Sequence, residues 1–225
     1  YLQPRRLHLH QMFTCILGCQ YIPSAEYFAH WLHHRVVLLE AHENFQKRTW
    51  RNRTTILSPS EPLSLTVPLQ KGKHQQQSIQ DVRIAYDEPW LQNHIRSLQT
   101  AYGKTAFAEE VLQGVFAILS IQHEKLWDLN LQILDYLIPM MSGTWKFSMT
   151  DTFVTSYAPE VFDFRSGVQA GGTNIPTPGL PVYPQVQRLH QPFQPNLTIL
   201  DALCHLGPGT FDYLTRYAAQ LYPTT

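Results

Sequence analysis

The opening of the chain alternates between strand-like and helix-like patterns, and no other feature constrains the fold as strongly. Residues 12–19 form a short apolar run bounded by Gly18, which favours a buried strand over a short helix. After Pro23 and Ser24, apolar side chains recur every three or four residues, which predicts a helix that ends near residues 33–34. Residues 36–39 are a continuous apolar run, typical of a parallel strand buried on both faces. This order predicts an α/β protein.

Patterns further along the chain extend this prediction. Alternating apolar positions predict a hairpin, and residues 89–136 carry the three- and four-residue spacing of a helical layer. The other predicted segments are a polar loop at 70–78, strands at 54–57, 63–69, 82–84 and 144–155, a long loop at 163–184, and helices at 197–206 and 211–221. We therefore expect one α/β domain at residues 12–225, with a mixed central sheet and a helical layer. Residues 1–11 are interpreted as an upstream extension or a cloning remnant.

Composition excludes several classes of protein. Seventeen basic residues balance seventeen acidic ones, so no global field attracts nucleic acid or an anionic membrane. No apolar run reaches the roughly 20 residues of a membrane helix. The three cysteines form no CxxC pair, which argues against a disulfide scaffold or a thiolate zinc site. We expect a cytoplasmic protein without a metal or a cofactor.

Polar residues are most concentrated directly after the predicted strand at 36–39. In an open α/β sheet, ligands bind outside the carboxyl ends of the strands, which is where this segment should lie. Basic side chains there could hold a phosphate or a carboxylate, and a histidine beside carboxylates could serve as a general acid or base. The alternative is a solvated loop whose charges keep the protein soluble. The catalytic candidates are Glu40, His42 and Glu43, and the binding candidates are Asn44, Lys47, Arg48, Arg51, Asn52 and Arg53.

The turn at residues 19–23 is a second candidate for binding. Gln20 and Tyr21 precede a predicted helix, whose free N–H groups attract anions. The chain has no glycine-rich phosphate loop, so nucleotide-dependent ligation remains only an alternative. Cys19 is either a nucleophile at the helix N-terminus or a buried inert thiol. The absence of GxSxG argues against a serine hydrolase.

Residues 193–201 provide the last candidates. Asn196 or Thr198 can cap the helix that follows, and Asn196 and Asp201 are also candidate binding residues. We predict that Asn196 lies near Arg51 or Arg53 as one wall of a shared pocket, with capping as the alternative. Replacing both arginines with alanine is then expected to weaken donor binding and to leave thermal stability nearly unchanged.

Several segments together resemble the WbqC-like protein family, in the short form found in Bacteroidetes-type bacteria. They include the QYIPSAEYF sequence at 20–28, the RNR tripeptide at 51–53 and the PNLTILDAL sequence at 195–203. The segment at 40–53, the LTVP sequence at 65–68 and Gly207-Pro208 follow the same order and spacing. The resemblance extends over residues 12 to about 213.

Members of this family occur with O-antigen and related polysaccharide genes. The resemblance implies a transferase of bacterial cell-surface polysaccharide biosynthesis that moves an aminoacyl or acyl group, such as glycyl, or a sugar. The alternative that it leaves open is a non-catalytic ligand-binding or scaffold protein of the same pathway. The expected ligand is a small molecule or an activated sugar or acyl donor. The candidate protein partners are a second copy of the chain and another enzyme of the pathway.

Overall fold

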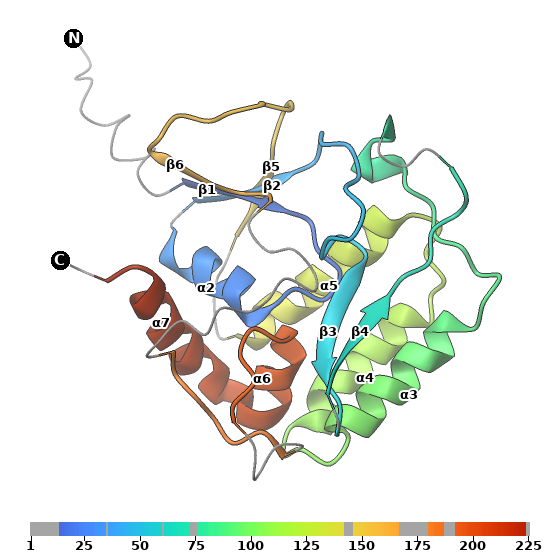
Figure 1. The fold of residues 1–225 in the computed structure, drawn as a ribbon, viewed down its shortest axis with the longest axis vertical. Coiled ribbons are helices and arrows are strands. Elements are labelled where there is room, and N and C mark those ends of the chain that lie inside the picture. The colour runs from blue at the N-terminus through green and yellow to red at the C-terminus, as the bar shows by residue number, and fades with distance from the viewer. Residues whose placement is uncertain are drawn as a thin grey trace.

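Four parallel strands form the central sheet of the computed structural model, in the order β5-β2-β1-β6. Their bounds are Ser148–Met149 (β5), Val36–Glu40 (β2), Thr14–Gly18 (β1) and Val161–Phe164 (β6) (Figure 1). The structure describes residues 14–34, 36–59, 61–72, 76–141, 146–166, 180–186 and 192–223. The predicted extension at 1–11 lies outside these residues.

The predicted strand–helix–strand opening is confirmed. Helix α2 (Ala25–His33) connects β1 to β2, and Ser24 caps its first turn by accepting a hydrogen bond from the Tyr27 backbone N–H. The two strands pair in register, with Thr14 opposite Val36 and Gly18 opposite Glu40. Their carboxyl ends therefore meet at one edge of the sheet.

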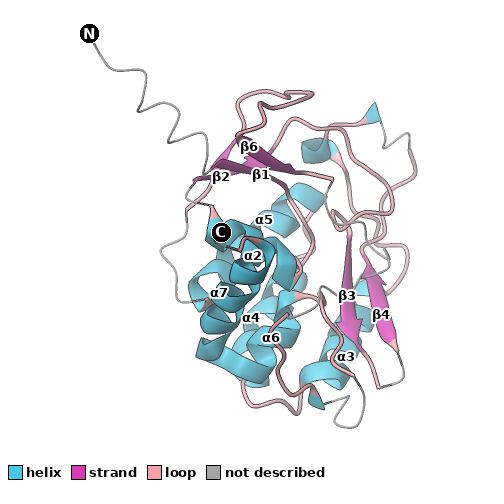
Figure 2. Cartoon of the chain, turned by 60° about the vertical axis from the view of Figure 1, so that its left-hand side comes forward, coloured by secondary structure: helices cyan, strands magenta, loops and turns pink. Residues whose placement is uncertain are grey.

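The predicted hairpin is also present, but as a sheet of its own. Strands β3 (Arg53–Leu57) and β4 (Pro62–Thr66) pair antiparallel. Figure 2 shows this pair beside the helices and apart from the central sheet. The α/β class is thus confirmed, and the two strand orientations expected in one mixed sheet are divided between a parallel sheet and an antiparallel pair.

Helices form a layer against one face of the parallel sheet (Figures 1 and 2). The middle of the chain forms α3 (Trp90–Tyr102), α4 (Ala108–Leu119) and α5 (Leu126–Met140). The last part forms α6 (Ile199–Leu206) and α7 (Thr210–Leu221), and short 3₁₀ turns occur at Ile79–Asp81 and Gly207–Gly209. Within the described ranges, no helix is both long enough and apolar enough to span a bilayer.

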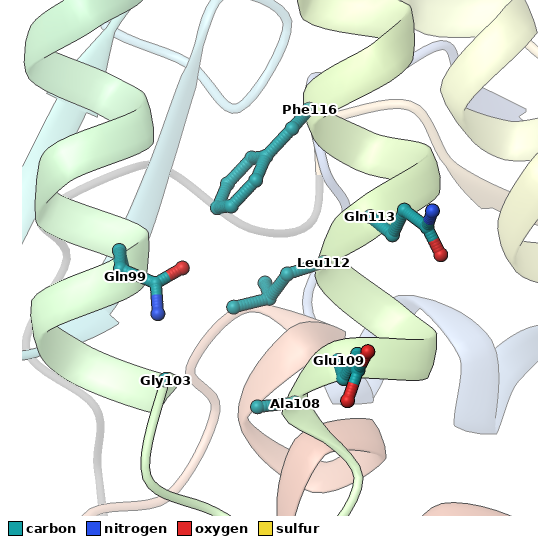
Figure 3. A pocket seen from close by; sticks show the side chains of 7 residues that line it. All are labelled: Gln99, Gly103, Ala108, Glu109, Leu112, Gln113 and Phe116. Atoms are coloured by element: carbon teal, nitrogen blue, oxygen red, sulfur yellow. The ribbon is translucent and has the colours of Figure 1, made fainter.

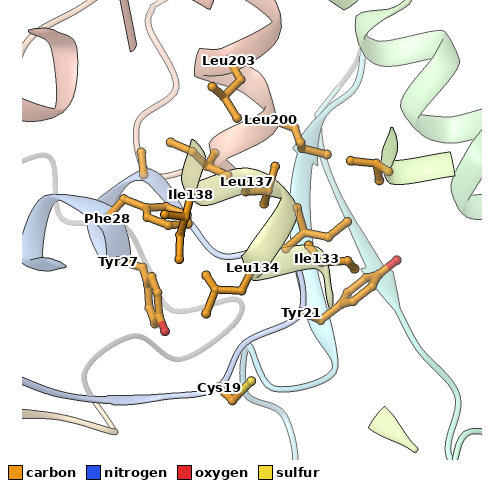
Figure 4. Close-up of a cluster of buried hydrophobic side chains, with 14 of the residues drawn as sticks. Cys19, Tyr21, Tyr27, Phe28, Ile133, Leu134, Leu137, Ile138, Leu200 and Leu203 are labelled. Atoms are coloured by element: carbon orange, nitrogen blue, oxygen red, sulfur yellow. The ribbon is translucent and has the colours of Figure 1, made fainter. Parts of the chain in front are cut away.

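Helix α5 lies in the middle of the hydrophobic core. Figure 4 shows its apolar side chains between those that follow β1 and those of α2 and α6. The labelled core residues are Cys19, Tyr21, Tyr27, Phe28, Ile133, Leu134, Leu137, Ile138, Leu200 and Leu203. Burial of this apolar surface against the end of β1 fixes the position of the carboxyl edge of the sheet.

Three predictions for the later strands were wrong in part. The loop expected from residue 163 begins later, because β6 includes Asp163 and Phe164; residues 167–179 lie outside the described ranges. In β6, aromatic and charged residues alternate, and Phe162 and Phe164 both pack on the His30 ring. Of the strand expected at 144–155, residues 144–145 lie outside the described ranges and the described part forms only β5. Residues 82–84 form two isolated bridges.

Candidate functional site

Glu40 ends β2 with its carboxylate fully buried at the carboxyl edge of the parallel sheet. Its Oε1 accepts hydrogen bonds from the Thr150 hydroxyl and from the His42 backbone N–H, both at 2.9 Å. Its Oε2 accepts one from Arg165 Nη1 at 3.0 Å. The carboxylate therefore connects β2 to the segments that follow β5 and β6.

A second buried ion pair lies next to the first. Arg51 donates from Nε to Glu43 Oε1 at 2.7 Å and from Nη2 to Glu43 Oε2 at 2.5 Å. The same Nη2 donates to the Arg165 carbonyl oxygen at 3.1 Å. Gly18 allows this approach, because a Cβ there would lie 3.3 Å from Arg51 Nη2. Burial raises the pKa of Glu43, and the hydrogen bonds from Arg51 oppose this rise.

Arg165 joins this network, although the sequence analysis did not identify it. It donates from Nε and Nη2 to the Asp163 carboxylate, and its guanidinium lies 5.0 Å from the ring centres of both Phe153 and Tyr157. Burial alone would raise the pKa of Asp163, but hydrogen bonds from Arg165 lower it overall. The two-residue spacing of Asp163 and Arg165 is a local signal for this pair, whereas no local pattern connects Arg165 with Glu40.

The sheet-edge network, defined as Glu40, Glu43, Arg51, Asp163 and Arg165, brings three predicted site residues together. Both candidate carboxylates are ion-paired in it, and each side chain is at most 2% exposed. A carboxylate in this state is not available to remove a proton from a substrate in open solvent. Of the three catalytic candidates, His42 is the exposed one, and its imidazole could still act as an acid or base.

A pocket of about 310 Å³ is lined by the same polar segment together with the end of β4 and the residues after it, and we call it the basic pocket. Among the described residues, no carboxylate lies at ion-pair distance from its three cations, Lys47, Arg48 and Arg53. Two of these, Lys47 and Arg48, are exposed to solvent. The described residues that line it are Phe45, Lys47, Arg48, Asn52, Arg53, Thr66, Val67, Pro68 and Leu69. The pocket is therefore positively charged and suited to an anion.

Asn52 and Arg53, which line the pocket, also have buried polar atoms without a partner among the described residues. The Asn52 amide donates from Nδ2 to the Val67 carbonyl oxygen at 2.9 Å, which attaches the polar segment to the residue after β4. Neither Asn52 Oδ1 nor Arg53 Nε has a hydrogen-bond partner among the described residues. Arg48 has a positive φ of 60°, a conformation uncommon for residues other than glycine. Backbone strain of this kind is concentrated at functional sites.

The turn after β1 has a structural role. The Tyr21 ring is fully buried, and its hydroxyl pairs with His94 Nδ1 at 2.8 Å. Gln20 is buried as well. Burial raises the pKa of Cys19 well above its ordinary value, which favours the inert-thiol alternative over the nucleophile.

The two late candidates lie at neither of these places. Asn196 donates from Nδ2 to Glu26 Oε2 at 2.6 Å, and it is absent from the described lining of the basic pocket. Thr198 is the residue that caps α6, accepting from the Leu200 N–H. Asp201 is fully buried, where it accepts hydrogen bonds from Tyr183 and Gln185. The predicted wall formed by Asn196 is thus not found in the basic pocket.

The remaining observations concern a second pocket, possible metal ligands and Asn44. A second pocket of about 480 Å³ lies between α3 and α4, where Figure 3 shows Gln99, Leu112 and Phe116 around it. Among the described residues that line it, none is a lysine, arginine or histidine. In the part of the chain that the structure describes, no group of three or more His, Cys, Asp or Glu residues is arranged to hold a metal. Asn44 is exposed and bridges to Ser78.

The model of the WbqC-like protein family matches residues 19–164, which is more than half of the chain. The chain belongs to this family. The match begins directly after β1 and ends with β6, so it contains the basic pocket and most of the sheet-edge network. The assignment to the short Bacteroidetes-type form stays a prediction.

A relative of this WbqC-like chain is the uncharacterized protein Rv1507c of Mycobacterium tuberculosis (strain ATCC 25618 / H37Rv). It is 25% identical over 230 residues, which cover 92% of this chain and 99% of the relative. No solved structure shows significant similarity to the chain.

Proposed function

We propose that this protein is a cytoplasmic transferase of bacterial cell-surface polysaccharide biosynthesis that holds the anionic group of an activated acyl or sugar donor in the basic pocket. The observation that supports this most is the set of three cations, Lys47, Arg48 and Arg53, without a carboxylate partner among the described residues. Arginine and lysine in such surroundings stabilise phosphate or carboxylate by charge-assisted hydrogen bonds. The pathway follows from the family resemblance.

In this proposal, His42 is the acid or base, and the sheet-edge network is a support. The Glu40 carboxylate accepts from the His42 backbone N–H and thereby fixes the start of the polar segment. The Glu43–Arg51 pair fixes its second half, which leads into the basic pocket. The network thus positions residues that contact the donor.

One observation supports a non-catalytic binding protein as a second candidate. Both carboxylates that could have served as bases, Glu40 and Glu43, form buried ion pairs with arginines. If His42 is not catalytic, the protein only binds its ligand. A scaffold that presents this ligand to another enzyme, or to a second copy of the chain, would then be its role in the pathway.

Thermal-shift screening with product analysis tests the proposal. A ligand that binds the native state must raise its stability by mass action. We expect stabilisation by at least one of the nucleotide sugars, acyl donors and aminoacyl carriers screened, followed by turnover when an acceptor sugar is added. Absence of stabilisation by every donor would contradict the proposal.

The His42→Ala variant separates the two candidates. We expect it to bind the donor as tightly as the unaltered protein and to transfer about 10²-fold or more slowly, the usual contribution of an acid–base residue. The matched control is His123→Ala, which changes a histidine between α4 and α5. Equal rates for both variants would rule out His42 as the acid or base. Donor binding without any turnover in the unaltered protein would identify the binding protein instead.

A further inference from the structure

The composition of the basic pocket defines the class of ligand more narrowly than its charge does. We infer that it recognises a phosphorylated sugar, with the cations holding the phosphoryl group and Asn52 accepting a hydrogen bond from a sugar hydroxyl. This inference rests on the proposed function, and it selects a phosphosugar over a carboxylate-bearing acyl or aminoacyl group as the bound part of the donor.

The number of cations favours a phosphoryl group. Lys47, Arg48 and Arg53 surround one pocket, and no acidic side chain is among the described residues that line it. A phosphate monoester carries a charge of about −1.5 to −2 at neutral pH and offers three acceptor oxygens, whereas a carboxylate carries one charge on two oxygens. Three donors on separate side chains are matched by the phosphoryl group and exceed what a carboxylate needs.

The uncharged part of the lining favours a hydroxyl-bearing ligand. Asn52 is only 7% exposed, and its Nδ2 is already used by Val67, so its Oδ1 is an acceptor that lacks a donor. A buried acceptor without a partner is unfavourable, and a hydroxyl donor from a ligand can offset this cost. A ligand that is anionic at one end and rich in hydroxyls at the other satisfies both parts of the wall.

The apolar lining and the size of the pocket agree with this class. Val67, Pro68 and Leu69 present carbon surface beside Phe45, which suits the C–H faces of a sugar ring. About 310 Å³ lies at the small end of the range for ligand pockets, roughly 300 to 1,000 Å³. A single phosphorylated sugar unit is a better match for this volume than a complete nucleotide sugar.

Isothermal titration with three probes tests the inference: glucose 1-phosphate, inorganic phosphate and acetate. We expect glucose 1-phosphate to bind about tenfold tighter than phosphate and phosphate about tenfold tighter than acetate. The Lys47→Ala/Arg48→Ala variant should lose about tenfold or more for both phosphorylated probes. The control, Lys104→Ala/Arg216→Ala, removes two exposed cations elsewhere and should bind like the unaltered protein.

A second readout uses the ligand itself. The second ionisation of a phosphate monoester occurs near pH 6, so affinity for glucose 1-phosphate should rise severalfold from pH 5.5 to 7.5. Acetate is ionised throughout this range and should show no such rise.

The outcomes distinguish the inference from the proposed function. Acetate binding as tight as that of phosphate overturns the inference and leaves a carboxylate donor open. Glucose 1-phosphate binding no tighter than phosphate overturns the role of Asn52 and of a sugar. If none of the three probes binds but a larger donor stabilises the protein in the thermal-shift screen, the inference is overturned and the proposed function is not. If no probe and no donor binds, both the inference and the proposed function are overturned.

Discussion

The environment of the Arg51 side chain indicates a structural role for this residue and not a ligand contact. The sequence pattern predicts a ligand contact whose loss leaves stability unchanged, yet Arg51 is 3% exposed and donates to Glu43 from two nitrogens. Removing one partner of a buried ion pair leaves an uncompensated charge, which costs about 3 to 5 kcal/mol. We therefore expect Arg51→Ala to lower the free energy of unfolding by this amount in urea titrations. Arg216→Ala breaks an exposed pair with Asp212 and should cost less than about 1 kcal/mol. Equal losses in the two variants would contradict a structural role for Arg51.

The pair of Tyr21 and His94 predicts how stability depends on pH. Burial lowers the pKa of His94 from 6.5 to about 4. Between these two values the unfolded chain binds a proton that the folded protein excludes, so stability falls as the pH drops through this window. The difference corresponds to about 3 kcal/mol at pH 4. Urea unfolding of the protein and of His94→Gln at pH 7 and pH 4.5 measures it. The variant should lose less stability on acidification, and identical losses would place the effect elsewhere.

Single residues also show where prediction from the sequence ends. Glu40, Glu43 and Arg51 could be grouped because Glu40 ends β2 and the other two follow it within one short segment. Arg165 could not, because it lies 125 positions from Glu40 and reaches it only through the pairing of β1 with β6. For Asn196, a ligand contact and a helix cap were both open alternatives, and neither included the partner that the structure shows, because α2 presents Glu26 to its amide.

At the scale of elements, segments with a complete local pattern were predicted, whereas the two shortest strands were not. The opening elements and the helices α3 to α7 carry apolar periodicity over several turns or a complete buried run, and the structure confirms them. Strand β5 has two residues and β6 has four, and both are defined by pairing with distant strands. Such short strands leave almost no local signal, because their stability comes from the sheet they join.

The end of α6 provides a test at this scale. Gly207 has a positive φ of 52°, and a Cβ there would lie 2.6 Å from the Phe107 ring. Left-handed strain and overpacking each cost about 1 to 3 kcal/mol, so Gly207→Ala should destabilise the protein by about 2 kcal/mol or more. Gly209 has a φ of −67°, and its nearest neighbour would be 3.7 Å away. Gly209→Ala should therefore be neutral or slightly stabilising in thermal unfolding. A similar loss in both variants would show that the turn tolerates neither side chain for another reason.

For the molecule as a whole, the balance of charge determines how an anion can be attracted. With seventeen basic and seventeen acidic residues, no net field guides a ligand, and the basic pocket must act through nearby cations. At physiological salt the Debye length is about 8 Å, so charges on distant elements are screened. Arg48→Ala and Arg216→Ala change the net charge equally, but only the first lies in the pocket. In titrations with inorganic phosphate at 0.15 M salt, we expect Arg48→Ala to weaken binding about tenfold or more and Arg216→Ala to leave it unchanged. Raising the salt concentration should weaken binding to the unaltered protein and to Arg216→Ala in parallel, with a smaller effect on Arg48→Ala because fewer charges remain to be screened. Equal weakening by the two variants would mean that the anion responds to the total charge of the protein, which would remove the basic pocket as its binding site.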